Sequence, residues 1–325
     1  MRFYSGLLPA LAALMSFAGH AVAQTFPSRP ITMIVPFAAG GPGDTRARVL
    51  AEHMRGTLGQ PVVVENVTGA GGSIGVGRVA QAPGDGYTLS VGNWSTHVVN
   101  PAVYSLKYDV VADFEPVGLV STQPLLILAN KAVPANDLKD LIAWLKANPG
   151  RATMGNSGIG SASHVSGVLF QNQTGTRFQL VPYRGSVQSI QDLIAGQIDM
   201  TFDQRTNALP HVQAGKIKAF AVTAPARLAA APDIPTMDEA GLPEMHVSVW
   251  GGLWAGKGTP KPAIAKLSAA VMEALADPAV RQRLLDIGYE VPPREQQTPE
   301  ALAAYQSAEI AKWWPIIKAA GVKAE

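Results

Sequence analysis

The fold is decided by residues 31–48, which read Ile31-Thr32-Met33-Ile34-Val35-Pro36-Phe37-Ala38-Ala39-Gly40-Gly41-Pro42-Gly43-Asp44-Thr45-Arg46-Ala47-Arg48. The apolar, β-branched start predicts a strand over Ile31–Phe37, and the glycines after it predict a turn. The apolar residues that follow have helical spacing, so we expect a helix over Asp44–Leu58. A glycine turn that opens a helix presents free backbone N–H groups at the positive end of the helix dipole. This geometry is typical of a site for a carboxylate or another anion.

Strand-like and helix-like segments alternate beyond this stretch, which predicts an α/β fold with parallel sheets and right-handed crossovers. In the first third of the chain, further elements are expected at Pro61–Asn66 (strand), Gly72–Gln81 (helix) and Tyr87–Val91 (strand). A second unit of the same kind is expected at Leu125–Ala129 (strand), Asn136–Lys146 (helix capped by Asn136), Ala152–Asn156 (strand), Ser161–Gln173 (helix), Phe178–Pro182 (strand), Val187–Ala195 (helix closed by Gly196), Ile198–Asp203 (strand) and Ile217–Val222 (strand).

The end of the chain is expected to be helical and to return to the first domain. Lys261–Leu275 and Val280–Ile287 have the spacing of a helical pair. Thr298 is expected to cap a final helix with Pro299 at its first position, and Pro315 to kink or end its regular part.

Two crossings divide the chain into two domains. We expect the chain to leave the first domain at Phe114–Pro124 and to come back at Glu244–Gly251. Residues 24–120 and 250–325 then form a discontinuous domain one, and residues 121–249 form domain two.

The first 23 residues have the composition of a signal peptide. Arg2 supplies the charge, Leu7–Phe17 is the short apolar core, and Ala21-Val22-Ala23 is a small-residue cleavage signal. We therefore expect a mature chain that begins at Gln24 and is exported to the periplasm. The apolar run is too short to span a bilayer, and no later stretch is long and apolar enough.

Composition excludes several classes of function. The chain has no cysteine, which excludes a disulfide scaffold, thiol catalysis and a zinc–thiolate site. It has 26 basic and 24 acidic residues, and removal of Arg2 with the signal leaves 25 against 24. A nearly neutral protein without a basic cluster is not expected to bind nucleic acid, and no metal or other cofactor is expected.

The turns that follow the predicted strands share a composition of glycine, serine, threonine and asparagine. In open α/β sheets, ligands bind beyond the carboxyl ends of the strands. Glycine lets the backbone approach a ligand, and hydroxyl groups add donors. We expect two sets of turns, one from each domain, to face each other across a cleft. Any single turn is also explained as an ordinary connection between a strand and a helix. The turns are Pro36–Asp44, Asn66–Gly75, Gly92–His97, Gly155–His164, Tyr183–Ser186 and Asp203–Gln204.

Three charged side chains in these turns have two interpretations each. Arg184 is placed to form a bidentate bond with a carboxylate, or it is a solvated surface arginine. Asp44 either caps its helix or contacts the ligand. Asp203 accepts from a ligand hydroxyl or ammonium, or it bonds a neighbouring turn. The aromatic residues expected to pack on a ligand body or in the core are Phe37, Trp94 and Tyr183.

Enzyme signatures are incomplete. The dinucleotide-binding pattern needs a glycine five residues after its first, and Ile74 follows Gly69 at that distance. Gly251–Lys257 imitates a phosphate loop, but Gly258 stands where the magnesium-ligating serine or threonine belongs.

Two other functions stay open at this point. One is an exported serine hydrolase that uses Ser157 or Ser161 with His164, although Ile159 stands where a nucleophile elbow needs glycine. The other is a ligand sensor for a membrane signalling partner, which would share the pocket.

A series of motifs carries a family resemblance. In order they are Val35-Pro36-Phe37, Gly40-Gly41 with Asp44, Glu65-Asn66, Gly69-Ala70-Gly71-Gly72, Asp85-Gly86-Tyr87-Thr88-Leu89, Asn100-Pro101, Asp113-Phe114-Glu115-Pro116-Val117, Gly160-Ser161 with His164, Val181-Pro182-Tyr183, Asp192-Leu193, Gly196-Gln197 and Gly258-Thr259-Pro260. Over essentially its whole mature length the chain resembles the periplasmic substrate-binding proteins of tripartite tricarboxylate transporters, the TctC or Bug family.

The resemblance implies a two-domain α/β clam of the type II periplasmic-binding-protein kind, hinged by crossover strands. It implies a monomeric receptor, not an enzyme, that closes on a small organic carboxylate and hands it to a membrane permease. The carboxylate is held by backbone amides and ordered water; a di- or tricarboxylate, an amino acid and an aromatic acid such as terephthalate all fit. The ligand-binding residues it implies are Phe37, Ala39, Gly40, Gly41, Asp44, Asn93, Trp94, Ser95, Thr96, Ser157, Gly158, Gly160, Ser161, His164, Tyr183, Arg184, Gly185 and Asp203.

The chain departs from the family pattern at a few positions. Thr68 stands where proline is common, and Arg184 stands where lysine is common, which keeps the charge and allows a bidentate bond. Asn93-Trp94 is unusual for the third turn, where the tryptophan either favours a flat aromatic carboxylate or covers the hinge.

Overall fold

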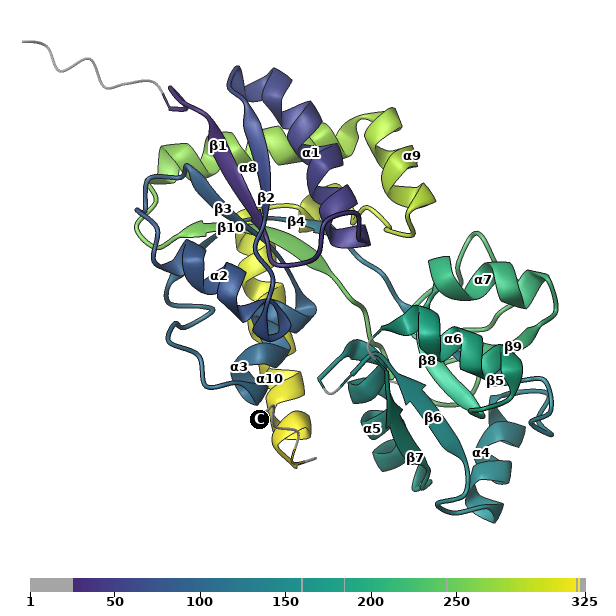
Figure 1. The fold of residues 1–325 in the computed structure, drawn as a ribbon. Coiled ribbons are helices and arrows are strands. Elements are labelled where there is room, and N and C mark those ends of the chain that lie inside the picture. The colour runs from purple at the N-terminus through teal and green to yellow at the C-terminus, as the bar shows by residue number, and fades with distance from the viewer. Residues whose placement is uncertain (1–25, 159, 184, 244, 320, 322–325) are drawn as a thin grey trace, which may run out of the picture.

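The described part of the chain forms two separate five-stranded sheets, one in each lobe of the molecule (Figure 1). The structure is a computed structural model that describes residues 26–319 and 321, apart from residues 159, 184 and 244. The expected signal peptide, residues 1–23, and the expected first mature residue, Gln24, lie outside the described residues.

Sheet one has the strand order β2-β1-β3-β10-β4. Strand β1 runs parallel to β2 and β3, as the alternation of elements predicts. Strand β10 lies antiparallel between β3 and β4, because it enters the sheet from the opposite end when the chain returns from domain two. The strands are β1 (Ile31–Val35), β2 (Val62–Asn66), β3 (Thr88–Asn93), β4 (Phe114–Ser121) and β10 (Gly251–Gly256).

Sheet two has the order β7-β6-β8-β5-β9. Strand β6 is parallel to β7 and β8, whereas β5 is antiparallel to β8 and β9. The parallel arrangement predicted for the first three strands is confirmed, whereas the prediction of a second parallel unit is wrong at β5, and β10 was not predicted as a strand. The two-domain α/β fold itself is confirmed. The strands are β5 (Leu125–Asn130), β6 (Thr153–Asn156), β7 (Gln179–Pro182), β8 (Met200–Gln204) and β9 (Ile217–Val222).

Helices cover both faces of sheet one. Helices α1 (Pro42–Leu58), α8 (Lys261–Ala276) and α9 (Pro278–Asp286) lie on one face (Figure 1). Helices α2 (Ser73–Ala80), α3 (Asn100–Val103) and α10 (Pro299–Ala319) lie on the other. The alternation along β1 accounts for both layers, because successive side chains of a strand point to opposite faces. Met33 packs in the cluster of α1 and α8, and Ile34 packs in the cluster of α2 and α10.

Helices also cover both faces of sheet two: α4 (Leu138–Ala147) and α5 (Ala162–Thr174) on one, α6 (Ser186–Ala195) and α7 (Arg205–Gln213) on the other. Gly196 ends α6 in the left-handed conformation, as predicted, and Ser161 is the N-cap of α5 rather than its first residue. The predicted cap of α4 is wrong by one residue, because Asp137 accepts the Asp140 amide at 2.7 Å. Helix α10 continues through Pro315, so the proline does not end it. Short helical turns occupy Ala70–Gly72, Ser95–Val99 and Arg294–Gln296.

The hinge is shorter than the sequence predicted, because β4 belongs to sheet one and only residues 122–124 cross outward. The two crossing segments pair with each other at Pro124 and Ser248, and the Val249 amide donates to the Gln123 carbonyl at 2.9 Å. A third segment joins them where Glu290, after α9, pairs with Thr122.

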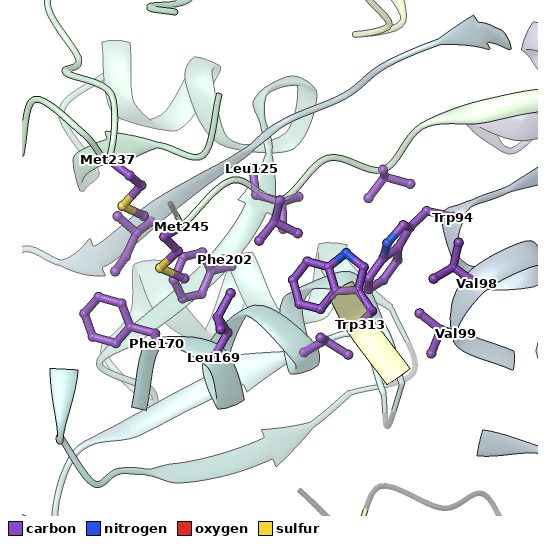
Figure 2. Close-up of a cluster of buried hydrophobic side chains, with 14 of the residues drawn as sticks. Trp94, Val98, Val99, Leu125, Leu169, Phe170, Phe202, Met237, Met245 and Trp313 are labelled. Atoms are coloured by element: carbon purple, nitrogen blue, oxygen red, sulfur yellow. The ribbon is translucent and has the colours of Figure 1, made fainter. Parts of the chain in front are cut away.

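A single apolar cluster continues from one lobe into the other. It runs from Trp94 and Trp313 of the first lobe, past Leu125 at the crossing, to Phe202 and Met245 of the second (Figure 2). The rings of Trp94 and Trp313 meet edge to face, with centroids 5.3 Å apart. The lobes are therefore joined by packed side chains as well as by the crossing segments.

Candidate functional site

A cleft of about 510 Å³ lies where turns of the two lobes meet. Domain one lines it with turns after β1 and β2, with Ser95 and with α3, and domain two lines it with the turn after β6. None of the described lining residues carries a formal charge at neutral pH. The lining consists of Pro36, Phe37, Ala38, Thr68, Gly69, Gly71, Gly72, Ser95, Asn100, Val103, Tyr104, Ser157, Gly160 and Ser161.

The turn before α1 is closed by its own hydrogen bonds. The Gly40 amide donates to the Asp44 carboxylate at 2.8 Å, and the Gly41 amide donates to the Ala38 carbonyl at 3.3 Å. Gly40 needs its positive φ of 78°, which glycine adopts without strain. Among the described residues, the amides of Ala39, Gly43 and Asp44 have no hydrogen-bond partner. The free donors at the start of α1 are therefore these amides rather than those of Gly40 and Gly41.

Asp44 is the anchor of this turn. Its carboxylate accepts from Arg48 Nε at 2.9 Å and from Asn66 Nδ2 at 3.0 Å, and Asn66 also donates to the Phe37 carbonyl. The bond from Arg48 is the main cause that lowers the pKa of Asp44 to about 2. Because Asp44 is buried and its oxygens are engaged, its side chain shapes the turn rather than facing the cleft.

The turn after β3 places its residues in two environments. Asn93 and Thr96 bond each other reciprocally, since the Asn93 amide donates to Thr96 Oγ1 at 2.9 Å and the Thr96 amide donates to Asn93 Oδ1 at 3.1 Å. Ser95 reaches the cleft, but Trp94 is fully buried against Trp313 (Figure 2). In this structure the Trp94 ring is thus part of the shared core and offers no face to a ligand. The adjacent His97 is also buried, and burial lowers its pKa to about 3.

The turn after β6 supplies the wall from domain two. Ser157 and Ser161 line the cleft, and Ser161 Oγ accepts the His164 amide at 3.2 Å as the cap of α5. The His164 ring accepts from the Gly160 amide through Nδ1 at 3.4 Å, and burial lowers its pKa. Among the described residues, no hydrogen bond joins this ring to a serine hydroxyl. The serine–histidine pair of a hydrolase is therefore not assembled here.

The remaining candidates lie at the ends of β7 and β8, beside the cleft lining rather than in it. The Tyr183 hydroxyl donates to Asp192 at 2.7 Å. The pKa of Tyr183 is raised to about 12, mainly by burial and also by the neighbouring Asp192 carboxylate. Asp203 accepts the Gln204 amide at 2.7 Å, its other oxygen has no partner among the described residues, and burial raises its pKa to about 7. Gly185 precedes α6 in an extended conformation. Arg184 lies outside the described residues.

The lining also contains residues that the candidate set omitted. Thr68, Gly69, Gly71 and Gly72 belong to the turn after β2, which the sequence placed among the turns facing the cleft, although none of the four was a candidate site residue. No polar turn after a predicted strand pointed to three further residues, Asn100, Val103 and Tyr104. Asn100 Nδ2 donates to the Gly71 carbonyl at 2.9 Å, so this side chain holds the second turn in place.

A larger cavity of about 620 Å³ lies between α8 and α10, beside the start of β4. Its lining is mostly apolar and comes from domain one alone, so closure of the lobes would not enclose a ligand there. Among the described residues, no helix is long and apolar enough to cross a bilayer.

The chain matches the family model described as "Tripartite tricarboxylate transporter family receptor" over residues 46–322. It is similar to the periplasmic binding protein BugD, with 42% identity, a TM-score of 0.77, and coverage of 92% of this chain and 100% of BugD. It is similar to MatC from Rhodopseudomonas palustris with bound malate, with 42% identity, a TM-score of 0.77, and coverage of 90% and 100%. A further R. palustris structure, with adipate, has 33% identity, a TM-score of 0.79, and coverage of 92% and 100%.

These proteins are solute-binding receptors rather than enzymes, and they have the same two-domain architecture as this chain. On the strength of the family model and of these similarities, the chain belongs to the receptor family of tripartite tricarboxylate transporters, the TctC or Bug family of periplasmic solute-binding proteins.

Proposed function

We propose that this receptor captures a small organic dicarboxylate in the cleft between its two lobes. The observation that carries the proposal is the lining itself, which offers glycine backbone, hydroxyl and amide groups from both lobes and no formal charge among its described residues. Such a site matches carboxylate oxygens with neutral donors. The related structures contain malate and adipate, which supports a ligand with two carboxylates.

Capture begins on domain one in this proposal. One carboxylate accepts from the free amides of Ala39, Gly43 and Asp44, at the positive end of the α1 dipole. Charge-assisted bonds of this kind are stronger than neutral ones. Domain two, whose Ser157 and Ser161 line the same cleft, then closes and adds these hydroxyl groups to the contacts of the ligand. Only these added contacts favour closure, since a ligand shifts an equilibrium by its differential affinity for the two states.

The cellular setting is part of the same proposal. Cleavage before Gln24 releases a monomeric receptor into the periplasm, where it delivers its ligand to the membrane permease of a tripartite transporter. We propose residues 24–120 with 250–325 as domain one and residues 121–249 as domain two, since sheet one takes its strands from the first set and sheet two from the second. A membrane signalling partner is the alternative recipient of the closed form.

Calorimetry on the chain from Gln24 onward tests this function. Malate and adipate are titrated alongside citrate, aspartate and terephthalate, with adipamide as an uncharged control. We expect saturable one-to-one binding of at least one dicarboxylate and none of adipamide. A ligand at 100 times its Kd should also stabilise the fold by about 2.7 kcal/mol in thermal unfolding. Absence of binding across all the acids would overturn the proposal.

A further inference from the structure

Arg46 is a charged side chain in an unusual place. It lies on the inner face of α1 and is 1% exposed. Its Nη1 donates to Ser121 Oγ at 2.9 Å and its Nη2 donates to the Gly92 carbonyl at 3.2 Å. Its Nε has no hydrogen-bond partner among the described residues. Both partners of this guanidinium are therefore neutral.

The surroundings of Arg46 belong to the hinge side of domain one. Ser121 is the last residue of β4, directly before the outward crossing, and Gly251 is the first residue of β10, directly after the return. A side chain at Gly251 would overlap the Arg46 guanidinium, so this glycine makes room for it. The ring of Tyr289, beside the third hinge segment, lies 5.0 Å from the guanidinium carbon. These contacts hold the charge near the end of β3, three residues before Ser95, which lines the cleft.

No described carboxylate balances this charge. None lies within ion-pair distance of Arg46, and the nearby Asp44 is paired with Arg48 at 2.9 Å. Burial lowers the pKa of Arg46, which shows that the surroundings disfavour its charge. An apolar side chain is often the less costly choice at a buried position, because removing a charge from water is expensive unless it is paired. The position therefore calls for an anion that the described chain does not supply.

We propose that Arg46 is the fixed cation of the receptor, and that a dianionic ligand at the start of α1 is its counter-charge. This inference rests on the proposed function. Arg46 is the fifth residue of α1, two positions after Asp44, and its guanidinium bonds the carbonyl of Gly92, three residues before Ser95 in the cleft. Opposite charges interact strongly where water is excluded and salt does not screen them. Arg46 then sets the preference for two negative charges over one without touching the ligand.

The test compares ligands that differ in charge. Adipate and its monoamide, adipamate, are titrated by calorimetry into the wild type, Arg46→Met and Arg46→Lys. In Arg46→Met we expect the affinity for adipate to fall at least tenfold and that for adipamate to fall less, so the preference for the dianion shrinks. Arg46→Lys, which keeps the charge, should retain most of that preference. Arg78→Met, which removes a surface arginine paired with Glu65, is the matched control.

Thermal unfolding without ligand separates this role from a structural one. We expect Arg46→Met to unfold at the wild-type temperature or above, since it removes an unbalanced buried charge. Equal losses for adipate and adipamate, or an unchanged preference for the dianion, would overturn the inference. If Arg46→Met does not fold, the test uses Arg46→Lys. Loss of the preference for adipate over adipamate in that variant would overturn the inference. Failure of the wild type to bind any carboxylate would instead overturn the proposed function.

Discussion

The carboxylate of Asp44 accepts the Gly40 amide at 2.8 Å and thereby closes the turn that precedes α1. The same carboxylate bonds Arg48 and Asn66, so one side chain joins the turn, the first helix and the end of β2. The shape of the proposed anion site therefore depends on an anion of the protein itself.

Asp44→Asn is expected to destabilise the fold in a pH-dependent way. The pKa of Asp44 is lowered from 3.8 to about 2, which corresponds to about 2 kcal/mol. Because the folded pKa lies below the unfolded one, this stability is fully present at pH 7 and is lost as pH falls from about 4 to about 2. Urea unfolding should show a deficit of about 2 kcal/mol at pH 7 and a smaller one at pH 3. Glu52→Gln, in an exposed pair with Arg283, should leave the stability nearly unchanged at either pH.

Asp203→Asn is expected to remove a loss of stability that the wild type undergoes as pH rises, the opposite pH dependence to that of Asp44. Burial raises the pKa of Asp203 to about 7, so in the folded protein its proton is retained between about pH 4 and pH 7. The unfolded chain releases that proton, and the wild type therefore loses stability as pH rises through this range. The wild type should melt at a lower temperature at pH 8 than at pH 5, and this difference should shrink in Asp203→Asn. Asp233→Asn, at an exposed position, should retain the wild-type difference, and equal pH profiles of all three proteins would contradict the prediction.

Gly251→Ala is expected to cost about 1–3 kcal/mol, because its new methyl group overlaps the Arg46 guanidinium. In the Arg46→Ala background the same substitution should cost much less, since the space is then free. Additive effects in this double-mutant cycle would show that the two residues do not compete for space. Gly56→Ala is the control, because this exposed glycine in α1 has open space around it and alanine should stabilise the helix by about 0.5–1 kcal/mol.

Arg184→Ala is expected to weaken carboxylate binding at least tenfold while leaving the fold intact. The reason comes from the sequence, where an arginine follows a predicted strand and precedes a helix, as a bidentate partner for a carboxylate would. Calorimetry with the best dicarboxylate measures the change, and circular dichroism checks the fold. Unchanged affinity would remove Arg184 from the site.

Local patterns carried most of the fold prediction. The strand and helix around the glycine turn were predictable because periodicity and turn chemistry act over a few residues. Strand β10 was not, because Gly251–Gly256 reads Gly-Gly-Leu-Trp-Ala-Gly, and three glycines in six residues do not predict a strand. Gly251 makes room for Arg46 and Gly252 for Leu302, and both of these side chains come from distant parts of the chain. Only packing shows why this segment is a strand.

The site was predictable to the extent that strand ends define it. Phe37, Ser95, Ser157, Gly160 and Ser161 line the cleft because each belongs to a turn near a strand end. The lining from α3 could not be inferred, since it depends on how that helix packs on the turn after β2. The burial of Trp94 could not be inferred either, because its partner, Trp313, comes from the last helix.

The apolar cluster that joins the lobes also bears on how such receptors diversify. At the border between the lobes, side chains of the first lobe, Trp94 and Trp313 among them, must move relative to those of the second lobe whenever the angle between the lobes changes. A substitution there alters the energy gap between the resting and engaged shapes while every group that meets the solute stays the same. Evolution can therefore retune the strength of capture at this border and leave the choice of solute unaltered.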